Sequence, residues 1–388
     1  MRILTVNYEY PPLGGGGGVA AANLAREFVR RGHAVDYVTT HFGDLPREEH
    51  VEGIRVVRVP VWGRRTLETA GILSMLSYPV AAVARALRLA RQCPYDLIHT
   101  HFAIPSGPAG CFLAARLKRP NVLTVYGGDI YDPSKPYSPH RHPLLKRAVR
   151  YVLDRADLVV PESEDLCRRT KAIYRTCTEV RRIPLGFVPK PYTAASRQEL
   201  GLRAEAVYAI AVSRLIPRKG YPDLLEAFRV ANVDALELLI IGDGPERPKL
   251  ERLCVELGIA PKAHFLGYVA DETKYQYLTT ADFFALATQH EGYGIVFQEA
   301  MYCGLPIATT NEGGQTDFLR EGRNALLTRP ADPAALAHSL RRLATDSALR
   351  ETLAANNRKD IRQQTIDVVA AEYLDVFEAL LARARAAT

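Results

Sequence analysis

The sequence lacks paired cysteines and the acidic motif that often holds a metal ion. Its six cysteines are scattered over 388 residues, and no two of them form a C-x-x-C pair. Neither a zinc site nor a framework of disulfides is therefore expected, and a reducing compartment is favoured. No D-x-D motif suited to a bound metal ion is present either. We accordingly expect no metal site and no cofactor.

Long apolar runs and nucleic-acid-binding motifs are also missing. No apolar run reaches the length of a membrane span, and the first residues, MRILTVNYEYPP, enter a strand directly instead of forming a signal sequence. The basic residues do not alternate with stacking aromatic residues, so nucleic acid is not an expected partner. Together these absences predict a cytoplasmic protein.

The residues that are present predict an α/β fold with two domains. Hydrophobic residues make up 47% of the chain, which is enough for two cores, and 388 residues are too many for one ordinary core. Strand-like runs alternate with helical runs throughout, which favours doubly wound parallel sheets. We expect a first domain at 1–186, a proline-containing linker at 187–196, a second domain at 197–364 and a terminal helix within 365–388.

Residues 281–310 read as a buried strand, a glycine-bearing loop, a helix and a second strand. Glu291 lies in the loop before a helix predicted to begin near Ile295, and Glu299 falls within the first turns of that helix. The unpaired N–H groups and the dipole of such a terminus favour phosphate, and open α/β sheets bind ligands at the carboxyl edge of their strands. The alternative is that both acids only complement the helix dipole.

The spacing of the two glutamates resembles a motif of a known family. The stretch EGYGIVFQEAMYCGLPI matches almost throughout the paired-glutamate motif of the retaining GT-B glycosyltransferases of the large group 1 family, also called glycosyltransferase family four. The resemblance implies two Rossmann-like domains that face each other across a cleft, with the terminal helix crossing back onto the first domain. It also implies that Glu291 lies against the transferred sugar as a catalytic residue and that Glu299 binds the ribose hydroxyls of the donor nucleotide.

A basic segment of the second domain extends the resemblance. The stretch SRLIPRKG resembles the G-R-L-x-x-x-K-G segment of the family, with Ser213 in place of the first glycine. The resemblance implies that Arg214 and Lys219 clamp the donor diphosphate, and that Gly294 and Ile295 at the helix terminus assist them in place of a metal cation. Two fixed cations can neutralise the charge of a leaving diphosphate, although a solvated basic turn is the alternative.

Glycine-rich turns contribute further candidate donor contacts. The loop EYPPLGGGGG lies between the first strand and a helix predicted at 19–31, and such loops let the backbone approach a phosphate closely. It is not a Walker loop, and no acid is well placed for a dinucleotide ribose, which disfavours a dehydrogenase. By resemblance the loop faces the donor across the cleft through Gly17 and Gly18. The loops that border the nucleotide base in the family correspond to Gly242, Tyr268 and Val269.

Two segments of the first domain are candidates for the acceptor side. The stretch VLTVYGGDIYD resembles the T-x-H-G-x-D segment of the family, with Tyr126 in place of the usual histidine and with Asp129 retained, which implies that both residues belong to the catalytic site. The strand DLIHTH presents His99 and His101 on the same side, because side chains alternate along a strand. These histidines either line an acceptor site or are hydrogen-bonded in the core.

The resemblance implies a retaining glycosyl transfer from a nucleoside diphosphate sugar. The acceptor, which the sequence does not identify, is a glycan, a lipid-linked molecule or a small molecule. The resemblance also implies that a phosphate oxygen of the leaving group takes the acceptor's proton, so no dedicated protein base is required. Arg214, Lys219 and the helix terminus would replace a metal ion. Two alternatives stay open: a nucleotide-sugar epimerase or hydrolase of the same fold, and a nucleotide-sugar-binding subunit without catalysis, which the substitution at Tyr126 suggests.

Charge and hydropathy leave a membrane-associated acceptor open. Residues 1–186 contain 27 Lys and Arg against 17 Asp and Glu, whereas the remainder of the chain contains 23 against 26. An anionic acceptor, an anionic membrane surface and solubility alone each explain this excess. The apolar segment 67–90 either lies on a membrane interface or packs in the core as a helix interrupted at Pro79. Peripheral attachment to a membrane therefore stays an alternative.

Overall fold

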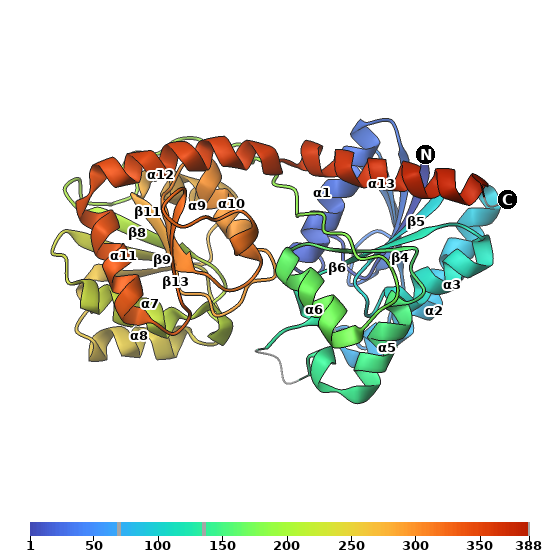
Figure 1. Ribbon diagram of the computed structural model, residues 1–388, viewed down its shortest axis with the longest axis horizontal. Coiled ribbons are helices and arrows are strands. Elements are labelled where there is room, and N and C mark those ends of the chain that lie inside the picture. The colour runs from blue at the N-terminus through green and yellow to red at the C-terminus, as the bar shows by residue number, and fades with distance from the viewer. Residues whose placement is uncertain (68–70, 134–136, 387–388) are drawn as a thin grey trace. The chain divides into compact units, whose positions relative to one another are not determined.

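Two compact units make up the computed structural model, which describes residues 1–67, 71–133 and 137–386. Unit 1 consists of Met1–Gly186 and the C-terminal stretch from Ile366, and unit 2 consists of Phe187–Thr365. Each unit is built around a parallel sheet flanked by helices, which confirms the predicted α/β, Rossmann-like fold (Figure 1). The stretch predicted as a linker, 187–196, lies in unit 2.

Unit 1 has a seven-stranded sheet in the order β3-β4-β2-β1-β5-β6-β7. The strands are β1 (Arg2–Asn7), β2 (Ala34–Thr40), β3 (Glu48–Val51), β4 (Ile54–Val59), β5 (Leu97–His101), β6 (Asn121–Val125) and β7 (Leu158–Pro161). All neighbouring strands are parallel except β3 and β4, which pair antiparallel. The sequence does not predict this edge hairpin, because EEHV in β3 lacks the alternation of apolar residues that marks a half-buried strand.

Helices cover both faces of the unit 1 sheet. They are α1 (Gly16–Arg30), α2 (Ile72–Gln92), α3 (Gly107–Leu117), α4 (Gly127–Ile130), α5 (Pro143–Leu153), α6 (Glu164–Tyr174) and α13 (Ile366–Ala386). On one face α1 packs beside α13 (Figure 1). The ring centroids of Phe28 and Phe377 lie 5.4 Å apart between these two helices. On the other face α2, α3 and α5 lie in sequence across the sheet. The C-terminal helix is therefore part of the unit 1 core.

Helix α2 corresponds to the predicted apolar segment, of which residues 68–70 lie outside the described residues. The interruption predicted at Pro79 is wrong, because α2 continues through it. A proline removes a single backbone N–H, and the buried neighbours Tyr78 and Ala82 hold the helix on the sheet at this point. Among the described helices, α2 alone is long and apolar enough to cross a membrane, so the expectation that no segment reaches that length is wrong for α2. Its buried side chains nevertheless belong to the core of unit 1.

Helix α5 lies in a basic stretch whose sequence does not indicate a helix. Its apolar residues Val149, Val152 and Leu153 are three and four positions apart, and they are buried against α3 and α6. The many charged residues between them mask this short helical pattern in the sequence.

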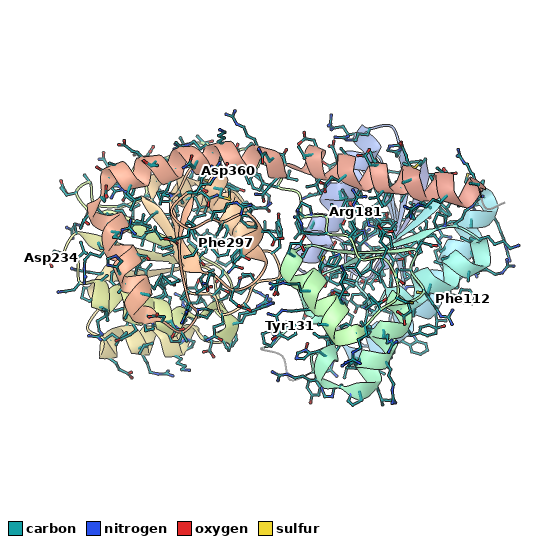
Figure 2. The ribbon with its side chains drawn as sticks, in the orientation of Figure 1. Phe112, Tyr131, Arg181, Asp234, Phe297 and Asp360 are labelled. Carbon is teal, nitrogen blue, oxygen red and sulfur yellow. The ribbon has the colours of Figure 1, made fainter. Side chains whose placement is uncertain are left out.

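Unit 2 has a six-stranded, entirely parallel sheet in the order β10-β9-β8-β11-β12-β13. The strands are β8 (Val207–Val212), β9 (Leu236–Ile241), β10 (Ala263–Gly267), β11 (Phe283–Leu286), β12 (Ile307–Thr310) and β13 (Ala325–Thr328). The helices are α7 (Tyr221–Ala231), α8 (Arg247–Glu256), α9 (Asp271–Thr280), α10 (Ile295–Tyr302), α11 (Pro333–Thr345) and α12 (Ser347–Asp360). Phe297 of α10, labelled in Figure 2, lies within this core. Its ring packs edge to face against that of Phe284 of β11. Because the strands are parallel, the loops after β8, β9, β10 and β11 meet at one edge of the sheet.

Candidate active site

Glu291 lies at the carboxyl edge of the unit 2 sheet, in the loop between β11 and α10. Its backbone oxygen accepts a hydrogen bond from the amide of Gly314 at 2.9 Å. The turn into α10 requires Gly294, whose φ of 96° is left-handed and whose Cβ would lie 2.6 Å from the Phe297 ring. Glu291 therefore precedes the helix and Glu299 lies inside it, as the sequence predicts.

The Glu291 carboxylate is buried and paired with Lys219. Lys219 Nζ donates a hydrogen bond to Glu291 Oε1, and Thr288 Oγ1 donates to the same oxygen at 3.2 Å. Burial opposes ionisation, but the charges of Lys219 and Arg218 and these hydrogen bonds hold the pKa of the Glu291 carboxyl below its usual value. Glu291 is thus a carboxylate at neutral pH, and the ion pair joins two predicted residues that are 72 positions apart.

Lys219 reaches this position through a tight turn after β8. A 3₁₀ turn at Pro217–Lys219 is followed by Gly220, whose φ is 65° and whose Cβ would lie 1.8 Å from the carbonyl oxygen of Ala287. Only glycine therefore lets the turn pack against the end of β11. Lys219 is buried, whereas Arg214 at the same turn is exposed to solvent. Arg218, an unspecified position in the motif, is an additional cation whose charge acts on Glu291.

Glu299 is paired with Lys274, a lysine outside the motifs found in the sequence. Lys274 of α9 donates from Nζ to Glu299 Oε1 at 2.6 Å and to Asp271 Oδ1 at 3.0 Å. Burial lowers the pKa of Lys274, but the two carboxylates outweigh burial, so the pKa is raised overall. No pattern in the sequence indicates this pair, because the two residues lie on different helices, 25 positions apart.

The loops after β9 and β10 bring three further candidates to the same edge. Gly242 has a φ of 127°, and a Cβ at this position would lie 1.9 Å from the carbonyl oxygen of Ser213. The loop after β9 therefore touches the loop after β8, which contains Ser213. Tyr268 is 87% exposed and Val269 is partly exposed. Within residues 1–67, 71–133 and 137–386, no three His, Cys, Asp or Glu side chains are grouped so that they could hold a metal ion. The edge therefore gathers cations, glycines and exposed aromatic surface from four strands.

In unit 1 the glycine-rich loop becomes helical earlier than predicted. Helix α1 begins at Gly16 instead of residue 19, so Gly17 and Gly18 lie in its first turn. A Cβ at Gly17 would lie 2.7 Å from Phe102 Cζ, and one at Gly18 would lie 2.8 Å from Glu9 Cβ. Close packing inside unit 1 thus explains both glycines, and their amides lie at a helix N-terminus where backbone N–H groups lack helical partners.

Asp129 and Tyr126 are engaged inside unit 1. Asp129 accepts hydrogen bonds from the amide of Tyr126, at the start of α4, at 2.8 Å and from the amide of Ala103, in the loop after β5, at 2.5 Å. The Tyr126 hydroxyl lies 2.9 Å from His101 Nδ1, and burial raises the pKa of this phenol. The geometry therefore gives both residues a role in stabilising the loop, and their catalytic role stays a prediction.

His99 and His101 are residues of the unit 1 core. Each is 1% exposed, and their rings, with centroids 4.1 Å apart, lie on the same side of β5 as predicted. His99 Nε2 lies 2.9 Å from Thr124 Oγ1. Burial lowers the pKa of both imidazoles, that of His101 to about 3, so both are neutral at neutral pH. The structure therefore shows the second of the two alternatives, in which both histidines are hydrogen-bonded in the core. Neither ring is exposed enough to line an acceptor site.

Comparisons with known proteins cover nearly the whole chain. A family model described as glycosyl transferases group 1 matches residues 193–360, and one described as glycosyltransferase family 4 matches residues 14–190. An uncharacterized glycosyltransferase of Methanocaldococcus jannaschii is 27% identical over 97% of this chain and 98% of its own. N-acetyl-alpha-D-glucosaminyl L-malate synthase of Bacillus anthracis is 25% identical over 92% of this chain and 91% of its own.

Solved structures share the fold. Sucrose-phosphate synthase from Thermosynechococcus elongatus has a TM-score of 0.84 and 23% identity, covering 98% of this chain and 99% of its own. The Anabaena protein HepE, solved with UDP-glucose, has a TM-score of 0.72 and 22% identity, covering 97% of this chain and 100% of its own. At these identities the likeness concerns the fold alone.

Proposed function

The chain is a glycosyltransferase of the group 1 family, and from that premise we propose that it transfers a glycosyl group from a nucleoside diphosphate sugar to an acceptor hydroxyl with retention of anomeric configuration. The observation that carries this proposal is the buried ion pair between Lys219, in the turn before α7, and Glu291, in the loop before α10, both at the carboxyl edge of the unit 2 sheet. A fixed cation and a fixed carboxylate thus lie where an open α/β sheet binds its ligand.

In this proposal the donor diphosphate binds beside Lys219, Arg214 and the N-terminus of α10. These positive groups neutralise the charge that grows on the leaving diphosphate. As the bond between the anomeric carbon and the diphosphate oxygen breaks, the acceptor oxygen attacks from the same face of the sugar. Its proton passes to the leaving phosphate oxygen, and the Glu291 carboxylate stabilises the positive charge that develops on the sugar ring. The scheme uses neither a metal ion nor a dedicated protein base.

The proposal also concerns which nucleotide and which sugar the donor contains. The Anabaena protein that shares the fold was solved with UDP-glucose, so a uridine diphosphate hexose is the first donor to test. Glu299 is the proposed partner of the ribose hydroxyls, because a carboxylate accepts hydrogen bonds from two neighbouring hydroxyl groups.

A donor screen followed by product analysis tests the proposed activity. Nucleoside diphosphate sugars are ranked by the rise in Tm that each gives the full chain, and the best donor is then incubated with candidate acceptors. A product with the mass of acceptor plus one glycosyl unit, and with the donor's anomeric configuration by NMR, supports transfer with retention. Free sugar or an epimerised nucleotide sugar formed without an acceptor would instead identify a hydrolase or epimerase, and binding without turnover would identify a binding subunit.

Glu299→Ala is expected to weaken nucleoside diphosphate binding by roughly 1 to 3 kcal/mol, through loss of charged hydrogen bonds to the ribose. Isothermal titration calorimetry with the diphosphate of the best donor measures the change. Glu272→Ala is the matched control, because Glu272 is an exposed carboxylate in the neighbouring helix α9. Equal affinity in Glu299→Ala and Glu272→Ala would rule out the ribose contact.

Turnover is expected to persist in excess EDTA, because Lys219, Arg214 and the α10 terminus supply the positive charge that the leaving group needs. Release of nucleoside diphosphate from the best donor and acceptor, followed with and without EDTA, measures the effect. Activity that disappears with EDTA and returns with magnesium or manganese would contradict the metal-free scheme.

A further inference from the structure

Three helices on one face of unit 1 contain basic residues and no acidic ones. Helices α2, α3 and α5, all within the described residues, contain no Asp or Glu. They contain seven basic residues: Arg85, Arg88, Arg91, Arg116, Lys146, Arg147 and Arg150. On the opposite face of the same sheet, α13 alone contains four acidic residues. We call the outer surface of α2, α3 and α5 the basic face.

The basic face also exposes large apolar side chains. In α2, positions 72, 76, 80, 84 and 88 form one exposed stripe at four-residue intervals, apolar up to Ala84 and ending in Arg88. Leu76 is 68% exposed and Val80 is 74% exposed. Phe112 lies on the outer side of α3 (Figure 2), and Leu144 is 77% exposed on α5. Apolar patches that extend over several elements mark interaction sites with proteins or membranes.

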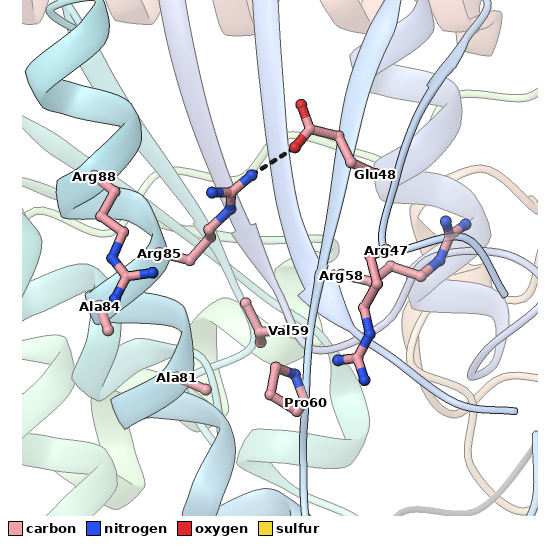
Figure 3. A pocket seen from close by; sticks show the side chains of 9 residues that line it. All are labelled: Arg47, Glu48, Arg58, Val59, Pro60, Ala81, Ala84, Arg85 and Arg88. Carbon is pink, nitrogen blue, oxygen red and sulfur yellow. Dashed lines mark hydrogen bonds and ion pairs between the residues drawn. The ribbon is translucent and has the colours of Figure 1, made fainter.

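Two cavities beside these helices are rimmed by cations. One, of about 340 Å³, lies between α2 and the strands β3 and β4. It is lined by four arginines, Arg47, Arg58, Arg85 and Arg88 (Figure 3). Glu48, the one acid that lines it, is paired with Arg85, and Arg58 is paired with Glu49, which leaves Arg47 and Arg88 as the cations for a phosphate. The other, of about 360 Å³, lies between α5 and α6 and is lined by Lys146, Arg147, Arg150 and Arg175, of which Arg150 is paired with Asp154. Arginine clusters of this kind suit phosphate oxygens.

We propose that the basic face docks unit 1 on the surface of an anionic lipid bilayer, with its exposed apolar side chains in the interface and lipid phosphates at the two cation-rimmed cavities. An anionic bilayer is the partner that we propose because its negative charge is complementary to the positive charge of these helices. Apolar residues surrounded by Lys and Arg favour the boundary between lipid head groups and acyl chains, where negative charge is supplied by the lipids. A symmetric contact between two copies would bring the same cations together without any acid from these helices.

The mode of contact follows from the buried side of α2. Ser74, Tyr78, Ala82 and Ala86 face the core, so the helix lies on the sheet and presents only its outer stripe. α2 therefore lies in the plane of the interface instead of crossing the bilayer, although its length and composition would allow a crossing. This surface belongs to unit 1 and does not involve the donor residues of unit 2, so the inference is independent of the proposed glycosyl transfer.

Co-sedimentation of the full chain with phosphatidylcholine vesicles, with and without phosphatidylglycerol, tests the proposal. We expect partition onto the anionic vesicles only, falling as salt is raised. Arg88→Glu/Arg147→Glu should reduce partition by more than about 10-fold, and Leu76→Ser/Val80→Ser by roughly 10-fold or more. Arg252→Glu/Val255→Ser is the matched control, because both side chains are exposed on α8 of unit 2.

Three outcomes would overturn the proposal. The first is equal partition of the parent protein onto neutral and anionic vesicles, and the second is undiminished partition of both basic-face variants at an unchanged Tm. The third is a parent protein that does not bind vesicles but forms a dimer by light scattering, with the dimer lost in Leu76→Ser/Val80→Ser. This result would show that the basic face is a contact between two copies of the chain. A control variant that binds vesicles like the parent, beside two basic-face variants that do not, supports the membrane surface.

Discussion

Lys219→Ala is expected to slow glycosyl transfer by roughly 10²-fold or more, because it removes a preorganised positive charge from the leaving diphosphate. The same change leaves the buried Glu291 carboxylate without its main counter-charge, which costs roughly 3 to 5 kcal/mol of the free energy of unfolding. Steady-state kinetics and urea unfolding of the same samples measure the two effects separately. Lys249→Ala is the matched control, because it removes an exposed lysine from α8 of the same unit.

The double variant Lys219→Ala/Glu291→Ala separates catalysis from stability. Removing both members of the pair leaves no unpaired buried charge, so much of the lost stability should return. Activity should stay low, because the cation at the leaving group is still missing. A Lys219→Ala protein that is folded and turns over like Lys249→Ala would contradict the diphosphate clamp, whatever its stability.

Glu291→Gln is expected to lower kcat by roughly 10²-fold while the affinity for nucleoside diphosphate changes little, because the carboxylate acts on charge that develops only in the transition state. The amide keeps the size of the side chain but removes its charge. Kinetics at saturating donor, together with calorimetry of the diphosphate, separate the two quantities. A variant with parental kcat and raised KM would show that Glu291 serves only ground-state binding.

The lowered pKa of Glu291 also predicts a pH dependence of stability. Because the folded protein binds the proton more weakly than the unfolded chain does, the ionised carboxylate contributes stability above the usual glutamate pKa, near about 4.3. This contribution is lost as the pH falls through the lower, folded-state pKa. The parent protein should therefore lose more stability below about pH 4.3 than Glu291→Gln does, and parallel acid unfolding curves for the two proteins would contradict this linkage.

Much of the donor edge could be predicted because its chemistry is local in the sequence. Glu291 and Glu299 lie on either side of one helix start, and Arg214 and Lys219 lie in one turn, so short motifs contain them. The pairing of Lys219 with Glu291 was not predicted, because it depends on β8 and β11 lying side by side in the sheet. Lys274 was missed for the same reason: its partner Glu299 is brought close only by the packing of α9 and α10.

The predictions for unit 1 were less accurate where burial decides a residue's role. Alternation along β5 correctly placed His99 and His101 on one side, but it cannot tell a core face from a ligand face. The resemblance to the family indicated Asp129 as a site residue. It could not show that both of its carboxylate oxygens accept hydrogen bonds from backbone amides. Composition showed the basic excess of 1–186, whereas its concentration on α2, α3 and α5 depends on the order of the strands.

Hydrogen exchange of the full chain, with and without nucleoside diphosphate sugars, tests the central claim most directly, because it shows where a donor binds without requiring the acceptor. The account predicts that at least one uridine, guanosine or adenosine diphosphate hexose slows exchange in peptides covering 214–220 and 289–299. In Lys219→Ala the same sugar at the same concentration should give much weaker protection. Protection confined to other peptides, or no protection by any of these sugars in a folded chain, would contradict the assignment of the donor site to this edge of unit 2.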